Sequence, residues 1–329
     1  MFEFADKPSS IACRPILRRL IATIPIAMKL FLGVDGGQSS TTALIGDEHG
    51  NILGKGVGGP CNHATAAEGR AKLERAVSAS LAAACAEAQL DPATVHFVAA
   101  CFGMSGGPDD KQAILAALLR VDRLIVTHDA AIALSGATAS GQGIVTIAGT
   151  GSMAFGRNAG QSARAGGWGY VFGDEGGAFD IMRQAVRAAL RMEEGWGPPT
   201  VLREALLDVT TQSSANGVLH LFYTPDWPRS RVAALASLVD VAASAGDAVA
   251  LRILGNAAQE LAMLAASVRA QLWQPGEAVD VAYIGGVFTS KPLLERYRTL
   301  VEIIPGNRCA APLRGPAEGA LLEAIRQSA

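Results

Sequence analysis

A strand–turn–strand pattern that occurs twice constrains the fold of this chain more than any other feature. Residues 30–46 read LFLGVDGGQSSTTALIG, an apolar run, a glycine-rich turn and a second apolar run, and residues 143–156 (GIVTIAGTGSMAFG) repeat that order. After each hairpin, short apolar runs alternate with segments of helical periodicity, which is typical of α/β sheets with parallel pairing. We therefore predict two similar α/β domains, residues 28–135 and 136–329, the second richer in helices.

The remaining elements follow from hydrophobic periodicity and from the turn residues between the periodic segments. In the first half we predict helices over 66–89 and 109–119 and strands over 95–102 and 123–127. In the second half the prediction is a helix over 179–192, a largely helical stretch over 200–272, a strand over 279–284 and a last helix near 318–327.

One glycine-rich segment resembles a dinucleotide motif without its context. GKGVGG at 54–59 fits G-x-G-x-x-G, but Pro60 and Cys61 follow it where that motif needs a helix. We interpret this segment as a loop, although residues 30–59 as a whole read as three strands joined by the turns GGQSS and DEHGN.

Composition excludes several classes of protein. Of the 329 residues, 50% are hydrophobic and 18% are charged, which suits a chain with sizeable cores and excludes a disordered one. The net charge of −2, without a long basic run, argues against nucleic-acid binding. Five scattered cysteines without a C-x-x-C pair indicate reduced thiols in a cytoplasmic protein. No later stretch is long and apolar enough to predict a membrane span.

The amino-terminal segment allows two interpretations. Arg14, Arg18 and Arg19 precede an apolar stretch, an order that resembles a signal peptide. Lys29 interrupts that stretch, however, and its end continues into the first glycine turn. We therefore interpret residues 30–34 as a strand and residues 1–27 as a poorly ordered extension.

Three glycine-rich turns follow apolar strands: DGGQSST (35–41), AGTGSM (148–153) and IGGVFTS (284–290). Glycine permits positive φ and lets a ligand approach the backbone closely. Convergent backbone N–H groups in such turns bind anions such as phosphate. The chain has no G-x-x-x-x-G-K-[ST] sequence, so the turns do not indicate a P-loop enzyme.

These turns and four further segments resemble the actin, hexokinase and heat-shock ATPase superfamily. The segments are NH (62–63), FGMSGG (102–107), HDA (128–130) and GGWGYVFGDEGG (166–177). Within that superfamily the chain resembles the N-acetylglucosamine kinase family, related to the BadF/BadG/BcrA/BcrD ATPases, over about residues 28–325. The resemblance implies two actin-like, ribonuclease-H-like domains with ATP in the cleft between them.

The resemblance also implies a set of nucleotide ligands. They are the glycines and hydroxyl or amide side chains of two phosphate loops and of an adenosine loop: Gly36, Gly37, Gln38, Ser39, Gly149, Thr150, Gly151, Ser152, Gly285 and Gly286. Asp35 is expected to face Mg²⁺ through water, which suits a cation that keeps its hydration shell. As a residue between a strand and a glycine turn, Asp35 is equally typical of a turn former.

For the sugar, the resemblance implies five ligands and one catalytic residue. The ligands are Asn62, His63, Gly167, Trp168 and Asp174, and Asp129 is expected to accept the proton of the attacking hydroxyl. Simpler interpretations exist for several of these residues. Asp129 and Asn62 stand where a helix N-cap is expected, and Trp168 is equally able to pack its loop. Met153 stands where some sugar kinases carry Asn, which leaves that contact with the substrate open.

The expected function is ATP-dependent phosphorylation of an aminosugar, N-acetylglucosamine to its 6-phosphate. Glucosamine and N-acetylmuramic acid are alternative substrates. A different class is an ATPase that activates a CoA-ester reductase or dehydratase, whose relatives hold an iron–sulfur cluster between subunits. The expected cofactors are ATP and Mg²⁺, and the expected assembly is a cytoplasmic homodimer without nucleic-acid or membrane partners.

Overall fold

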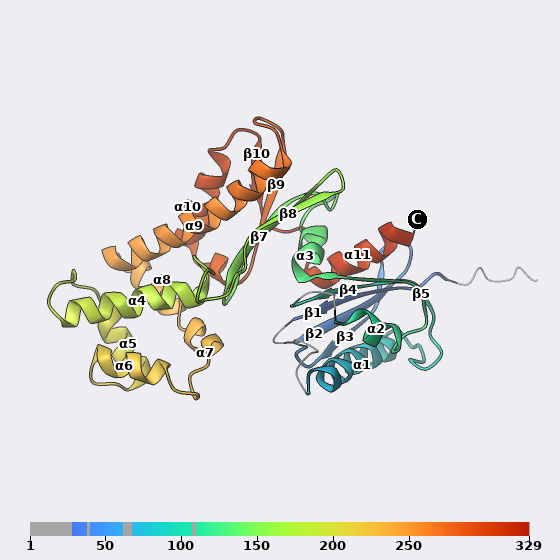
Figure 1. The fold of residues 1–329 in the computed structure, drawn as a ribbon, viewed down its shortest axis with the longest axis horizontal. Coiled ribbons are helices and arrows are strands. Elements are labelled where there is room, and N and C mark those ends of the chain that lie inside the picture. The colour runs from blue at the N-terminus through green and yellow to red at the C-terminus, as the bar shows by residue number, and fades with distance from the viewer. Residues whose placement is uncertain (1–27, 38–39, 62–67, 107–109, 329) are drawn as a thin grey trace, which may run out of the picture.

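The structure is a computed structural model that describes residues 28–37, 40–61, 68–106 and 110–328. It contains two five-stranded sheets with corresponding strand orders (Figure 1). The first sheet runs β3 (Ile52–Gly58), β2 (Thr41–Gly46), β1 (Phe31–Gly36), β4 (Phe97–Met104) and β5 (Val121–His128). The second runs β8 (Gln161–Gly166), β7 (Ser152–Asn158), β6 (Gly143–Ala148), β9 (Val279–Ile284) and β10 (Asn307–Ala310).

The pairing within the two sheets is also the same. In each sheet the first three strands along the chain pair antiparallel, and the last two add in parallel on the other side of the first strand. The carboxyl ends of β1, β4 and β5 therefore lie at one edge of the first sheet. This confirms the predicted α/β class and the doubled organisation.

The segment expected to be a loop at 54–59 is strand β3, so that interpretation was wrong. Its glycines lie against helix α1 (Gly69–Glu87). A Cβ on Gly54, Gly56 or Gly58 would overlap a backbone carbonyl oxygen of α1. The strand carries glycine at alternate positions because the helix backbone approaches it too closely for any side chain.

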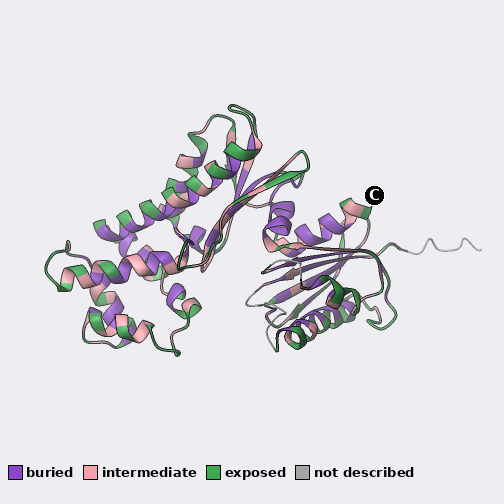
Figure 2. Ribbon diagram, viewed as in Figure 1, coloured by how far each residue is buried: buried purple, intermediate pink, exposed green. Residues whose placement is uncertain are grey.

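Helices cover both faces of the first sheet. Helix α1 packs on β3 and β2, and the short α2 (Gln112–Ala116) lies beside β5. Helix α3 (Asp129–Ala137) leaves the end of β5 and leads to β6 of the second sheet. The inner strands β1, β2 and β4 and the sheet-facing sides of these helices are largely buried, whereas the edge strands β3 and β5 are more exposed (Figure 2).

The last helix departs from the predicted division at residue 136. The apolar side of helix α11 (Pro316–Ser328) packs on β1, β4 and α3 of the first half (Figure 1), and its Glu323 pairs with Arg157 of β7 in the second sheet. Its Ala320 and Leu321 join Phe31 and Ile132 in one buried cluster. The sequence pattern identifies the helix but not the sheet that receives its apolar face.

The second half is rich in helices, as predicted. They are α4 (Ala178–Glu193), α5 (Leu202–Thr210), α6 (Ala215–Phe222), α7 (Arg229–Ala234), α8 (Ser237–Ser244), α9 (Ala248–Leu272) and α10 (Lys291–Glu302), with a 3₁₀ turn η1 (Gly286–Thr289). Helix α9 packs against β7, β8 and α10 and supplies much of the largest buried cluster. None of the described helices combines the length and the apolar character that a membrane span requires.

Candidate active site

Asp129 lies where strand β5 passes into helix α3. Its carboxylate accepts two hydrogen bonds, from the Ser105 hydroxyl to Oδ2 (2.7 Å) and from the Ala130 N–H to Oδ1 (2.8 Å). His128 occupies the N-cap position of α3, and Asp129 is the first helical residue. The expectation that Asp129 is the N-cap was therefore wrong by one residue. Its carboxylate is instead held in a fixed orientation at the strand edge, by Ser105 of the FGMSGG segment.

Asp35 lies at the end of β1, at the same edge of the sheet. Burial, followed by the negative charge of Asp129, raises the pKa of Asp35 from 3.8 to about 6. Two carboxylates close enough to interact, one of them largely buried, form a site that favours a cation. Among the described residues there is no group of three or more potential ligands that would enclose a metal ion. The two acids thus fit a hydrated Mg²⁺ bound mainly through phosphates better than a protein cage.

Gly149–Ser152, the segment expected to be the second phosphate loop, lies on the amino-terminal end of helix α4. The Ala178 and Phe179 N–H groups donate to the carbonyls of Gly149 (2.8 Å) and Thr150 (3.1 Å). The Ser152 hydroxyl donates to the Glu175 carbonyl at 2.5 Å. These bonds tie the loop to the GDEG segment, so its shape is fixed before any ligand binds.

Asp174 is buried against that same phosphate loop. Its backbone has a φ of +64°, and its carboxylate lies so close to Gly151 that a Cβ there would overlap it. Its Oδ1 accepts a weak hydrogen bond from the Ser152 N–H (3.4 Å), and the guanidinium of Arg229, on α7, lies 3.3 Å from Oδ2. The candidate sugar ligand is therefore brought directly beside the candidate phosphate ligands.

The adenosine loop meets the second phosphate loop across one cavity. Gly285 has a φ of +119° and lies so close to Ala148 that a side chain there would overlap its backbone. Gly149, Thr150 and Gly286 share the lining of a cavity of about 390 Å³ with residues of α7 and α8. This cavity has the position and size of a nucleotide pocket.

Other predicted residues lie apart from this centre. Trp168 is 65% exposed and stacks on the guanidinium of Arg164, 4.5 Å from the ring centre, so its indole packs the loop surface. Gly167, with φ +74°, is exposed in the same loop. Gln38, Ser39, Asn62 and His63 lie outside the described residues. Gly36 and Gly37, at the end of β1, belong to the edge that carries Asp35.

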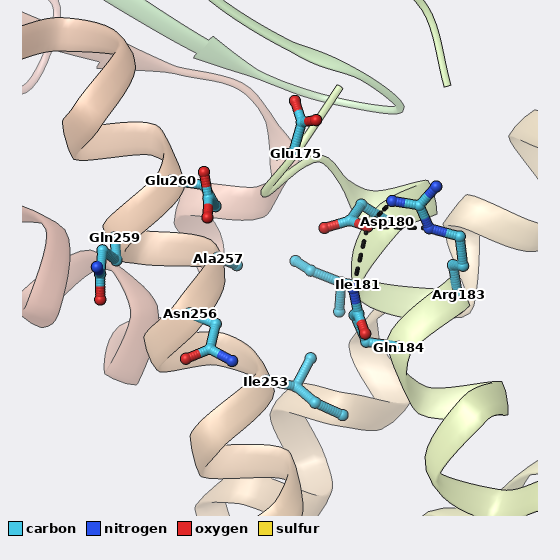
Figure 3. A pocket seen from close by; sticks show the side chains of 10 residues that line it. All are labelled: Glu175, Asp180, Ile181, Arg183, Gln184, Ile253, Asn256, Ala257, Gln259 and Glu260. Atoms are coloured by element: carbon cyan, nitrogen blue, oxygen red, sulfur yellow. Dashed lines mark hydrogen bonds and ion pairs between the residues drawn. The ribbon is translucent and has the colours of Figure 1, made fainter. Parts of the chain in front are cut away.

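Glu175 does not cap helix α4, whose N-cap is Gly177 and has no side-chain cap hydrogen bond. The Gly176 N–H donates instead to Asp180, whose carboxylate also pairs with Arg183 at 2.5 Å. Figure 3 shows Glu175, Asp180 and Glu260 around a second cavity between α4 and α9. This cavity lies behind the GDEG segment and contains none of the predicted site residues.

Three residues near the site were not predicted from the sequence. Ser105 lies inside a recognised segment but was not singled out, whereas Arg229 and Asp240 lie in a helical region with no distinguishing pattern. Arg229 follows Pro228 at the start of α7, and Asp240 lines the nucleotide-sized cavity from α8. Their roles depend on contacts between distant parts of the chain, which a single sequence does not display.

Comparisons with known proteins place the chain among sugar kinases in sequence and fold. An N-acetylmuramic acid/N-acetylglucosamine kinase from Clostridium acetobutylicum is 33% identical over 271 residues, covering 80% of this chain and 87% of the relative. An N-acetyl-D-glucosamine kinase from Dictyostelium discoideum is 28% identical over 319 residues, 91% of this chain and 99% of the relative. The crystal structure of a candidate N-acetylglucosamine kinase from Chromobacterium violaceum superposes with a TM-score of 0.73 at 27% identity, over 91% of this chain and 99% of that one.

A more distant structure, a glucokinase from Streptomyces griseus, shares the fold with a TM-score of 0.53 at 20% identity, over 91% of this chain and 99% of that one. The sequence pattern of the BadF/BadG/BcrA/BcrD ATPase family matches residues 32–324. That match spans both sheets, both glycine hairpins and the adenosine loop. This chain belongs to the BadF/BadG/BcrA/BcrD ATPase family.

Proposed function

We propose that this protein transfers the γ-phosphoryl group of ATP to a hydroxyl of N-acetylglucosamine, giving the 6-phosphate. The observation that carries the proposal is the burial of Asp174 against Gly151 and Ser152 of the second phosphate loop. A carboxylate in that place is suited to accept hydrogen bonds from sugar hydroxyls directly beside the phosphate being transferred. The names of the kinases at 33% and 28% identity support the same substrate class.

Within this proposal, Asp129 orients the attacking hydroxyl and accepts its proton. Phosphoryl transfer depends mainly on positioning and on charge stabilisation, so a base held in one orientation suffices. The hydrogen bonds from Ser105 and Ala130 provide that orientation. The backbone of Gly149–Ser152 contacts the phosphates, and the cavity beside Gly286 holds the nucleoside. Mg²⁺, when bound near Asp35, would neutralise charge on the phosphates.

Arg229 favours a second substrate, N-acetylmuramic acid, as an addition to the first. This sugar carries a carboxylate, and the guanidinium of Arg229 lies beside the candidate sugar ligand Asp174 with 32% of its side chain exposed. Arginine binds carboxylates through paired N–H donors. The relative from Clostridium acetobutylicum is named for both sugars.

A coupled assay of ADP release across hexoses and aminosugars tests the proposal. We expect N-acetylglucosamine to raise turnover well above the sugar-free ATPase rate. Asp129→Asn should lower kcat by roughly 10²–10⁴, the usual contribution of a general base. Its thermal stability should stay near that of the wild type. Asp208→Asn, on the exposed surface of α5, is the matched control and should keep full activity.

If no sugar raises ADP release, the kinase proposal fails. The alternative of a reductase- or dehydratase-activating ATPase then becomes the hypothesis to pursue, and bound iron and sulfide would support it. The four cysteines of the described chain, Cys61, Cys85, Cys101 and Cys309, are all buried and give that alternative no support. The homodimer and the cytoplasmic location stay predictions.

A further inference from the structure

The nucleotide-sized cavity contains one ionisable side chain. The other described residues of its lining are small, hydroxyl-bearing or aliphatic, among them Gly149, Thr150, Leu254, Gly286 and Ser290. The exception is Asp240, on the first turn of α8. A single carboxylate in a neutral, partly enclosed cavity needs hydrogen-bond donors, because burying it without them is costly.

Within the protein, only part of that need is met. The Ser290 hydroxyl donates to Oδ1 of Asp240 at 2.5 Å, and Ser290 is itself buried, with 6% exposure. In the part of the chain that the structure describes, no hydrogen bond to Oδ2 of Asp240 is formed. The carboxylate is therefore anchored through one oxygen and presents the other to the cavity.

The position of Asp240 and Ser290 in the cavity indicates which part of a nucleotide they contact. The phosphate end is marked by Gly149 and Thr150, and Gly285 lies against Ala148, immediately before them. From Gly285 the chain passes through the 3₁₀ turn η1 to Ser290, which is the last residue of the IGGVFTS segment (284–290). Asp240 is thus held by the segment expected to bind adenosine and not by the expected phosphate loop.

We propose that Asp240 selects the nucleotide base, by accepting a hydrogen bond from the exocyclic amine of adenine at Oδ2. The inference rests on the proposed kinase function and adds the residue that recognises the base. A carboxylate can only accept hydrogen bonds, so it pairs with an amine. A base without an amine at that position would cover the half-buried carboxylate of Asp240 without giving its Oδ2 a donor, and such sites discriminate strongly.

The test is a cycle between one side chain and one group of the nucleotide. ATP is compared with purine riboside 5′-triphosphate, which lacks only the 6-amino group, in wild type and in Asp240→Ala, with saturating sugar. We expect the wild type to prefer ATP by roughly 10- to 100-fold in kcat/KM, the effect of one hydrogen bond to a charged group. In Asp240→Ala that preference should fall to about 1, with the loss confined to ATP.

Two further comparisons keep the inference falsifiable. Asp240→Asn retains the size and one acceptor oxygen, so it should fold and keep an intermediate preference. 2′-Deoxy-ATP controls for the ribose, and its ratio to ATP should be the same in wild type and both variants. If Asp240→Ala lowers the two ribonucleotides equally, or removes discrimination against 2′-deoxy-ATP instead, Asp240 does not read the amine. Absence of any sugar-dependent turnover in the wild type would contradict the kinase proposal itself, which is a different result.

Discussion

Replacing Asp35 by Asn should stabilise the fold while removing activity. In the ligand-free protein, the charge that Asp35 carries above pH 6 lowers the free energy of unfolding, because the carboxylate is largely buried and faces the charge of Asp129. Its pKa rises from 3.8 to about 6. Because each pKa unit corresponds to about 1.4 kcal/mol, the shift corresponds to about 3 kcal/mol, which is an upper bound on the lost stability. The Asn variant avoids this cost, and we expect about 1–3 kcal/mol of added stability at pH 8.

The pH dependence identifies the cause. The folded-state pKa of Asp35 is higher than the unfolded-state value, so protonation favours the folded state and the benefit is lost as pH rises through about 6. The stability difference between Asp35→Asn and wild type should therefore be close to zero below pH 4, grow between about pH 4 and 6, and then level off. Urea unfolding with EDTA, at pH values from 4 to 8, measures it, with Asp208→Asn as the exposed-carboxylate control.

A cation should reverse the comparison. Mg²⁺ with ADP offsets the repulsion in the wild type, so it should stabilise the wild type more than Asp35→Asn. Sugar kinase activity of the variant should be low at every pH in that range. A variant that is less stable than wild type at pH 8, or a stability gain that is the same at pH 4 and pH 8, would refute the reasoning.

Three other substitutions test separate contacts. Arg229→Gln removes the cation beside Asp174, so it should raise KM for N-acetylmuramic acid more than for N-acetylglucosamine, with a circular dichroism spectrum like that of the wild type. Equal effects on both sugars would show that Arg229 only positions Asp174. Gly319→Ala should lower the melting temperature by several degrees, since its Cβ would overlap the Ile132 carbonyl of α3, and Gly255→Ala, which has open space around it, should not. Glu323→Gln should cost about 1–3 kcal/mol at pH 7 in urea unfolding, a loss that shrinks as pH falls below the ordinary carboxyl value of 4.5.

The features that were predictable from the sequence are those carried by local pattern. Both hairpins, strand β9 and the long helical region depend on apolar periodicity and on turn glycines close to one another in the chain. Asp129 and Asp174 were found because they lie inside short motifs that resemble a known family. Their placement at one edge of a sheet and on a phosphate loop then follows from the topology.

The features that could not be predicted depend on contacts across the chain. Arg229 lies 55 residues from Asp174, and Ser290 lies 50 residues from Asp240, without any pattern that links them. Helix α11 is amphipathic, and its sequence does not show which of the two sheets its apolar face packs on. Strand β3 was misread because its glycines, which usually weaken a strand, are there for the close approach of α1.

Each candidate site residue is attached to one half of the molecule, so a closing movement of the two halves would carry these residues with it. Asp35 is part of β1, and Asp129 is tied to the first half by Ser105 and by the packing of α3 on α11. The second phosphate loop and Asp174 belong to the second half, where Ser152 binds the GDEG backbone. A rotation of one half against the other, at the packing of α3 on β6 and β7, should therefore leave each pair intact and change the separation between Asp129 and the Gly149–Ser152 loop. Such a movement would assemble the reacting groups when the sugar binds, and limit hydrolysis of ATP in its absence.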